Sequence, residues 1–526
     1  MSATSPAADS NVLAVAKGAG FLASGRTFSS VVRLITAVLL ARWLGAEGYG
    51  LYILCISVAF AASSVASLGL DVAMERYIAV AARRQDDASA RGTLQIGVLG
   101  TLIPGLVVAG ILIVLAEAIS VHLFDDADLT PLMGLSAALA VVIGMSTLLV
   151  AVLVGSKRID QSALADHVMQ PLARLGFLLL LAPLGMTPFR AGVALLLSYV
   201  VSVGVMLTFI DRKIPLAGLV KPADRDVRGI TAFAFPFWFT GFLRILRTRI
   251  QPLLLGVVGT VANVGVFAVV TSASALGRLA NASISTALRP TLAELHDVGD
   301  AKEVGRLYAT TTRWTLAVSL PVFVFIALVP DSLLGLFGPG FETGVTALVI
   351  AASAEVVNGA TGMCGPIIAM SGYNKLKVAN ATAWMIVSLL ANVIMIPLWG
   401  VNGAAIAILV STTSINAIRV VELWILMRIL PWDAHSWKPF AAAGGAAAVA
   451  WPAVALLPDR MALPLLVAVA LGIGAVFVVF VVLLGLEPDD RKIVDRLAHR
   501  ASRMWGRVRR RPAPRPDVDE VSDPWS

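Results

Sequence analysis

The sequence predicts an all-α polytopic membrane protein of about 14 transmembrane helices, arranged as two pseudo-symmetric six-helix lobes and a C-terminal helix pair. Three observations predict this fold class: the composition, the recurrence of long apolar runs, and the alternation of charge between successive connections. Of the 526 residues, 58% are hydrophobic and 14% are charged, whereas about a quarter of the residues of a soluble domain are charged. The mean hydropathy is +0.85.

Apolar runs long enough to cross a bilayer recur along nearly the whole chain. About 20 helical residues cover the ~30 Å hydrocarbon core of a membrane. The expected spans are residues 15–43, 49–70, 93–117, 131–155, 163–184, 190–210, 231–257, 262–285, 312–337, 344–370, 377–399, 403–428, 439–457 and 463–486. Glycine and proline occur inside several of them, as membrane helices tolerate.

Basic residues gather in every second connection between these spans. Arginine and lysine recur in residues 76–91, 212–228 and 302–313, whereas the alternate connections, such as 117–129 and 330–344, are acidic or neutral. By the positive-inside rule the basic connections lie in the cytoplasm. The sequence therefore predicts a multi-pass protein of the cytoplasmic (cell) membrane with both termini cytoplasmic.

The same boundaries divide the chain into six parts. They are a cytoplasmic N-terminal segment (1–14), an N-lobe (15–210), a cytoplasmic linker (211–230), a C-lobe (231–428), two additional spans (429–486) and a tail (487–526). The tail begins as a basic amphipathic helix suited to the anionic inner leaflet and ends as a disordered segment. Because these basic residues directly follow a span, we expect no nucleic-acid partner. The N-terminus lacks the basic region and cleavage site of a signal peptide.

Residues that bind metals or carry out covalent chemistry are sparse. Cys55 and Cys364 both lie inside apolar runs, and the five histidines form no metal-type pair. We therefore expect no metal site, no cofactor and no catalytic residue. An enzyme such as a polysaccharide polymerase or ligase is the alternative, and it predicts a long outer loop with catalytic residues, whereas the outer connections here are short.

A glycine-rich turn recurs along the chain, at residues 44–52, 258–267 and 397–405. Glycine permits a tight reversal between packed helices. The first two turns lie six spans apart, and an even spacing gives both halves the same orientation, with the repeat axis along the membrane normal. Chance recurrence of short glycine-rich turns is the alternative.

Polar side chains follow one face of the two helices that open each half. The four sets are Arg26, Ser29, Arg33 and Thr36; Ser57, Ser64, Ser67 and Asp71; Thr240, Arg244, Arg247 and Gln251; and Thr271, Ser274, Arg278, Asn281 and Ser285. Spacings of three, four and seven place each set on one side of its helix, and Arg249 falls off that face. A charge facing lipid costs at least ~2.5–3.5 kcal/mol at the bilayer centre. The stripes therefore predict a water-filled, cationic cavity between the halves.

The arginines of these stripes are the predicted substrate-binding residues. Arg33, Arg244 and Arg247 fall near mid-span, and Arg26 and Arg278 fall in the cytoplasmic half. A guanidinium binds phosphate bidentately, which favours an anionic substrate such as the diphosphate of a lipid carrier with an attached sugar. The alternative for each arginine is snorkelling to the interface or pairing with a carbonyl.

An acid also lies deep inside the tenth span. Glu355 is followed by Asn358 on the same helix face, and the pair is a predicted site for coupling to Na⁺ or H⁺. Pairing of Glu355 with a buried arginine is the alternative.

Several short motifs resemble those of the polysaccharide-export (Wzx-type) flippases. They are residues 44–50 (LGAEGYG), residues 372–375 (GYNK), and residues 400–405 (GVNGAA) preceded by Asn392 and Pro397. These flippases share a superfamily with the lipid II flippases and the multidrug/toxin extruders, and the resemblance covers about residues 15–485.

The resemblance implies a V of two six-helix lobes, alternating access and a sodium or proton gradient as driving force. It also implies the substrate, a polyprenyl-diphosphate-linked oligosaccharide moved from the cytoplasmic to the outer leaflet for cell-surface polysaccharides such as lipopolysaccharide. Membrane lipids, a polysaccharide polymerase and glycosyltransferases are the implied partners. Arg247-Thr248-Arg249 departs from the family, since many members carry an Asp-Arg pair here. A lipid II-type peptidoglycan precursor flippase and a multidrug/toxin extruder are the alternatives, although an extruder cavity usually needs acids.

Overall fold

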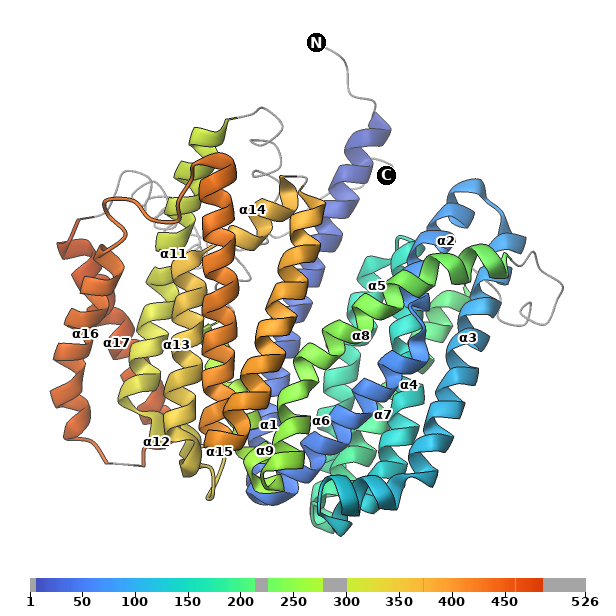
Figure 1. Cartoon of the computed structure of the whole chain (residues 1–526), viewed down its shortest axis with the longest axis horizontal. Helices are drawn as coiled ribbons and strands as arrows, with labels where there is room; N and C mark the ends of the chain where they lie inside the picture. The colour runs from blue at the N-terminus through green and yellow to red at the C-terminus, as the bar shows by residue number, and fades with distance from the viewer. Residues whose placement is uncertain (1–5, 213–225, 278–299, 372, 459, 486–526) are drawn as a thin grey trace, which may run out of the picture.

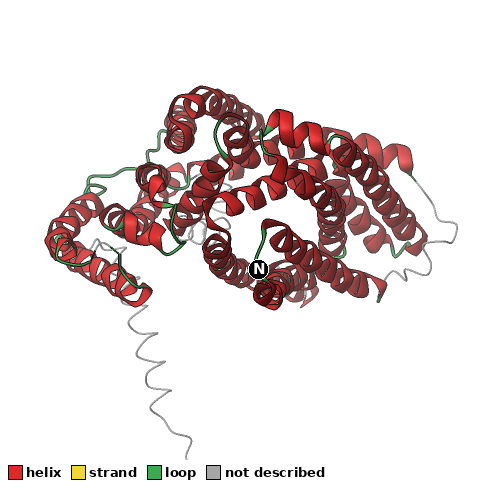
Figure 2. Cartoon of the chain, turned by 90° about the horizontal axis from the view of Figure 1, so that it is seen from below, coloured by secondary structure: helices red, strands yellow, loops and turns green. Residues whose placement is uncertain are grey.

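The computed structural model describes residues 6–212, 226–277, 300–371, 373–458 and 460–485. Within these ranges the chain forms helices joined by short connections and contains no strand, as Figure 2 shows from below. Nine helices of the described residues are long and apolar enough to cross a membrane, or up to ten when a bent pair is counted as one span. The prediction of an all-α polytopic membrane protein is confirmed. The count of fourteen spans stays a prediction.

The first half of the chain is built around one long bent helix. Its elements are α1 (Pro6–Ser67), α2 (Leu70–Arg84), α3 (Asp87–Val114), η1 (Ala118–Leu123), η2 (Ala127–Leu129), α4 (Thr130–Gly155), α5 (Ile159–Ala163), η3 (Leu164–Met169), α6 (Gln170–Leu181), η4 (Ala182–Leu184) and α7 (Pro188–Asp211). The two arms of α1 meet at Gly45, which has φ 68° and ψ −178°. Side chains disfavour that backbone conformation, so the glycine permits the bend.

The second half also contains a long bent helix. Its elements are α8 (Val227–Val258), α9 (Val261–Ser274), η6 (Ala275–Gly277), α11 (Ala301–Leu328), α12 (Pro330–Gly335), η7 (Glu342–Gly344), α13 (Val345–Thr361), α14 (Cys364–Met370) and α15 (Asn374–Met427). Like α1, α15 consists of two arms that meet at a glycine of positive φ, Gly400 (φ 54°). Two of the three predicted glycine turns are therefore bends inside long helices.

The two halves meet at the end of the molecule that carries these turns, here called the turn face. Buried residues of both halves, including Tyr52, Leu54, Val264 and Phe267, share one apolar core there. In Figure 1 the helices of the two halves diverge from this region, near α9 and the bend of α1, toward the opposite end. The structure is thus closed at the turn face.

The first part of α8 packs on the first half. Ile230 and Ala234 belong to the same buried cluster as Met74 and Ile78 of α2. The helix then bends by 50° between Val227–Leu243 and Thr248–Val258. This bend carries α8 from the first half toward the turn face, where it leads into α9.

The last two helices form a pair on the outside of the second half. These helices, α16 (Lys438–Ala455) and α17 (Leu463–Leu483), pack with α11 through buried residues that include Leu316, Ala442, Ala446 and Phe477. Alanine and glycine on α16 let the helix backbones approach closely.

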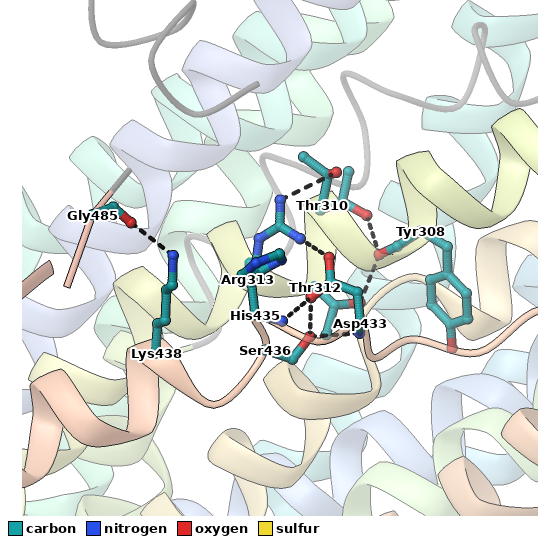
Figure 3. A network of polar contacts seen from close by, with 10 residues as sticks. Tyr308, Thr310, Thr312, Arg313, Asp433, His435, Ser436, Lys438 and Gly485 are labelled. Carbon is teal, nitrogen blue, oxygen red and sulfur yellow. Dashed lines mark hydrogen bonds and ion pairs between the residues drawn. The ribbon is translucent and has the colours of Figure 1, made fainter. Parts of the chain in front are cut away.

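A polar network ties the connection before α16 to α11 (Figure 3). The guanidinium of Arg313, which is only 7% exposed, pairs with the carboxylate of Asp433. The other carboxylate oxygen of Asp433 accepts hydrogen bonds from the backbone N–H of His435 (3.0 Å) and the hydroxyl of Ser436 (2.9 Å). Trp432 donates its indole N–H to the carbonyl of Ala360 at 2.8 Å. The network therefore fixes where the last helix pair begins.

Replacing Asp433 with asparagine is expected to lower the thermal stability. The change removes the carboxylate that pairs with the buried Arg313 guanidinium, and breaking a fully buried pair costs about 3–5 kcal/mol. Asp433 keeps 32% of its side chain exposed, so we expect a smaller loss, on the order of 2 kcal/mol. The matched control is Glu303→Gln, which breaks the exposed pair with Arg306 and should cost roughly 0–1 kcal/mol. Equal melting temperatures for both variants in detergent would contradict the expectation.

Candidate functional site

A group of charged and phenolic side chains lies inside the span region of the first half. It consists of Arg33, Arg174, Arg249, Asp166, Tyr52 and Tyr199, here called the arginine cluster. Tyr199 of α7 joins the group, because it interacts electrostatically with Asp166 and with all three arginines. The members come from α1, η3, α6, α7 and α8, so the cluster exists only in the folded protein.

Arg33 lies in the first arm of α1, in the part nearer to the Gly45 bend, and is exposed. It precedes the Gly45 bend by twelve residues, which is about 18 Å along a helix. Its guanidinium interacts electrostatically with Asp166 and Arg174. Asp166 is held by η3, a π-helical segment inside an otherwise α-helical span, and such segments are frequent at functional sites. The Asp166 carboxylate also lies 3.1 Å from Nδ1 of His167.

Arg174 is anchored on a buried tyrosine. It donates a hydrogen bond to the hydroxyl of Tyr52, a fully buried residue of the second arm of α1. Its guanidinium also lies 5.6 Å from the centre of the Tyr52 ring. The Nε of Arg174 is buried and has no hydrogen-bond partner among the described residues.

Arg249 reaches the cluster from the second half of the sequence. It lies on α8 beyond the bend, with its guanidinium 4.4 Å from the centre of the Phe60 ring on α1. Its Nε is likewise buried without a hydrogen-bond partner in the part of the chain that the structure describes. A buried, unsatisfied donor on a charged group is costly. The cluster therefore contains two arginine donors that no described residue satisfies.

The charges of the cluster do not balance. Three arginines and one aspartate leave a net charge of +2 when His167 is neutral. Intramembrane ionisable groups are expensive, and they mark substrate or ion pathways. The arrangement therefore suits a ligand with about two negative charges.

The structure brings one of the five predicted arginines into this cluster, namely Arg33. Arg26, Arg244 and Arg247 lie on α1 and α8, but their side chains fall outside the described part of the structure, and Arg278 lies outside the described residues altogether. No predicted arginine is therefore contradicted, and a substrate-binding role stays a prediction for all five.

The small hydroxyl residues of the first two stripes pack inside the protein. Ser29, Thr36 and Ser57 are buried. The hydroxyls of Thr36 and Ser57 donate to carbonyls of their own helix, at 2.8 Å and 2.7 Å. Between Ser29 and Thr36, only Arg33 is exposed on that stripe, so the arginine rather than the hydroxyls offers a binding group.

Sequence reasoning missed Arg174 and Asp166, and it set Arg249 aside. The available signal for the first two was that they are charges, of opposite sign, inside the apolar run 163–184. A single charge in a membrane span must face protein or water, just as a stripe of polar residues must.

The predicted coupling residues Glu355 and Asn358 lie half-buried on α13. The side-chain oxygen of Asn358 accepts a hydrogen bond from the amide of Asn416 on α15, at 3.4 Å. Glu355 lies beside Gly277 at the end of η6. The described residues contain no group of three or more His, Cys, Asp or Glu residues that could hold a metal ion. A role of Glu355 in ion coupling stays a prediction.

Comparison with known proteins adds a family and relatives. Residues 15–296 match the model of the family described as "Polysaccharide biosynthesis protein". The chain is 26% identical over 283 residues to the "Probable flippase AglR" of Haloferax volcanii. That match covers 53% of this chain and 58% of the relative, so it spans little more than half of the relative's length. The chain is also 20% identical over 382 residues to the "Probable low-salt glycan biosynthesis flippase Agl15" of the same organism. That match covers 72% of this chain and 77% of the relative.

Solved structures show the same fold at low sequence identity. The chain resembles a structure of the lipid II flippase MurJ in an inward closed conformation, with a TM-score of 0.66 and 14% identity over 87% of this chain and 97% of that one. It also resembles an inward-facing transporter of the multidrug resistance MATE family, with a TM-score of 0.62 and 17% identity over 76% and 94%.

Proposed function

The chain belongs to the polysaccharide biosynthesis protein family, and from that premise we propose that it is a flippase for lipid-linked oligosaccharides. Its substrate is an oligosaccharide joined through a diphosphate to a polyprenyl carrier, and it moves from the cytoplasmic to the outer leaflet of the cell membrane. The names of both Haloferax volcanii relatives support this activity. The observation that carries the proposal is the arginine cluster, with its net positive charge and unsatisfied donors inside the membrane.

The charge of the cluster matches the proposed substrate. A diphosphate diester carries two negative charges, and the cluster carries a net charge of +2. Arginine binds phosphate through a planar fork of N–H groups. The buried Nε atoms of Arg174 and Arg249 then gain acceptors from the phosphate oxygens. The diphosphate thus supplies acceptors that the described residues do not.

The closed turn face sets the direction from which the site is loaded. By the positive-inside rule the basic connections, and with them the diverging ends of the halves, lie in the cytoplasm. The diphosphate and the sugar enter between the halves from that side, while the polyprenyl tail stays in the lipid. The halves then close on the cytoplasmic side and open at the turn face, driven by a sodium or proton gradient.

A cation extruder shares the fold but not this electrostatic preference. The likeness to a MATE transporter concerns the architecture alone. A cationic drug is repelled by three arginines that face a single aspartate, whereas any lipid diphosphate is attracted. The lipid-linked precursor of peptidoglycan contains the same diphosphate and is therefore the nearest competitor for the site.

The proposal is tested with purified protein in proteoliposomes. We expect the protein to move a fluorescent, diphosphate-linked oligosaccharide lipid between leaflets, measured by quenching with an impermeant reductant. The same oligosaccharide on an uncharged polyprenyl carrier should not move faster than in protein-free vesicles. Lipid II and ethidium serve as competing substrates. Uptake of ethidium without movement of the lipid-linked oligosaccharide would overturn the proposal in favour of an extruder.

A further inference from the structure

A cavity lies beside the first arm of α1, near the turn face. Its volume is about 900 Å³. One wall is the end of the first arm of α1, from Leu34 to Arg42. The facing walls are the hairpin between α12 and α13, the end of α9 with η6, and the connection between α16 and α17. We call this cavity the lateral groove.

The lateral groove is apolar in its depth and open toward the membrane. Leucine, isoleucine, valine and phenylalanine side chains form its walls. Ile35 at its edge is 46% exposed and Leu463 is 58% exposed, and exposed apolar residues of a membrane span face lipid tails. From Leu34 to Arg42 the wall extends about 12 Å, which fits the hydrocarbon depth of one leaflet of a ~30 Å core.

Two arginines lie at the rim of the groove. Arg42 donates its Nε–H to the carbonyl of Leu336 at 2.7 Å, which fixes the guanidinium over the hairpin. That bond uses one of the five N–H donors of an arginine. Arg460, from the connection before α17, contacts Glu342 at 3.1 Å and is 80% exposed. Glu342 is itself held by the backbone N–H of Gly340 at 2.8 Å.

The net charge of the residues that line the groove favours one class of lipid over another. Among the residues that line the groove, Arg42, Arg460 and Glu342 are the charged ones, and they sum to +1. A phosphodiester with one negative charge complements this rim, whereas a diphosphate brings a second negative charge toward Glu342. The depth for one acyl chain and the single positive charge both favour an ordinary phospholipid over the transported carrier.

We infer that the lateral groove binds an anionic membrane phospholipid, with its phosphate between Arg42 and Arg460 and an acyl chain along α1. In the first half, this lipid contacts α1. In the second half, it contacts the hairpin between α12 and α13, the end of α9, and the connection between α16 and α17. A ligand stabilises the state to which it binds best. Because residues of both halves line the groove, we expect the bound phospholipid to stabilise the arrangement of the halves in this structure.

The test uses the full chain in nanodiscs that contain phosphatidylglycerol and phosphatidylcholine. Native mass spectrometry of the released protein is expected to show phosphatidylglycerol retained in preference to phosphatidylcholine. Arg460→Gln alters an exposed side chain and should reduce that preference about fivefold, and the Arg42→Gln/Arg460→Gln variant about twenty-five-fold. Arg190→Gln, at a half-buried arginine of the first half near the turn face, is the control for loss of one positive charge and should retain the preference.

Filling the groove gives an independent check. Ile35→Trp is expected to lower retention of both phospholipids while the arginine rim stays intact. Equal retention of phosphatidylglycerol by wild type and the double variant would overturn the inference. So would displacement of the bound lipid by a polyprenyl diphosphate but not by added phosphatidylglycerol. Because none of these measurements follows transport, they stand or fall separately from the flippase proposal.

Discussion

Replacement of Gly50 or Gly265 with alanine is expected to abolish transport while the protein still folds. A Cβ atom on Gly50 would lie 1.9 Å from the carbonyl oxygen of Val261. A Cβ atom on Gly265 would lie 2.0 Å from the carbonyl oxygen of Ala46. Both distances are far below van der Waals contact with a backbone atom, so the two halves cannot meet at the turn face as they do in this structure.

The two contacts are reciprocal. Each glycine lies in the recurring turn of its own half and touches the turn of the other half. Alanine favours a helix by about 1 kcal/mol over glycine, so local helix stability rises rather than falls. A loss of transport then reports on the contact between the halves.

Accessibility measures the expected shift toward a state that is open at the turn face. A Thr271→Cys reporter on α9 should react faster with an impermeant maleimide added from the outside when Gly265→Ala is also present. The native Cys55 and Cys364 are buried and give little background. Gly110→Ala is the matched control, since nothing lies within 4 Å of a Cβ at that position. Unchanged labelling and wild-type transport in Gly265→Ala would refute the role of these glycines.

Local sequence patterns were sufficient to predict the helices and their turns. Apolar runs require helices because a bilayer satisfies no exposed backbone group. The glycines at 45 and 400 were predictable as reversals, because the positive φ they adopt is disfavoured for other residues. The contact between the turns of the two halves is a tertiary contact. It could not be predicted, because local sequence patterns do not specify which distant segments pack together.

The candidate site was predictable only in part, for a geometric reason. The predicted polar stripe on α8 assumes a straight helix, in which each residue is rotated by 100° from the one before it. On that assumption Arg249 lies off the polar face. Because α8 bends by 50° between Leu243 and Thr248, that rotation does not hold across the bend, and Arg249 faces Phe60 and the cluster instead. Arg174 was missed because its partner, Tyr52, lies 122 residues away in the sequence.

Arg249→Met is expected to lower transport and raise thermal stability together. Methionine keeps the length of the side chain and packs against Phe60, while it removes a buried charge whose Nε has no partner among the described residues. Replacing buried charges with well-packed apolar groups is often neutral or stabilising by about 1–4 kcal/mol. We expect a gain of about 1 kcal/mol, measured as a higher melting temperature in detergent.

The transport loss has a different origin, because the diphosphate loses a charged donor. A hydrogen bond to a charged group contributes about 1.5–3 kcal/mol, so the affinity for the lipid-linked substrate should fall roughly 10- to 150-fold. Arg249→Lys keeps the positive charge but lacks the planar fork of N–H donors. Its affinity for the substrate should therefore lie between those of the wild type and Arg249→Met. Arg84→Met, at an exposed position of α2, is the control for loss of one positive charge.

The opposite signs separate a binding role from a structural one. If Arg249 stabilised the fold, its replacement would lower the melting temperature and the transport rate together. If it were an inert buried charge, the melting temperature would rise with transport unchanged. Only a charge held at a cost for the sake of a ligand gives a more stable protein that transports less. The same logic applies to Arg174, except that its replacement also leaves the buried Tyr52 hydroxyl without a partner, so its stability gain should be smaller.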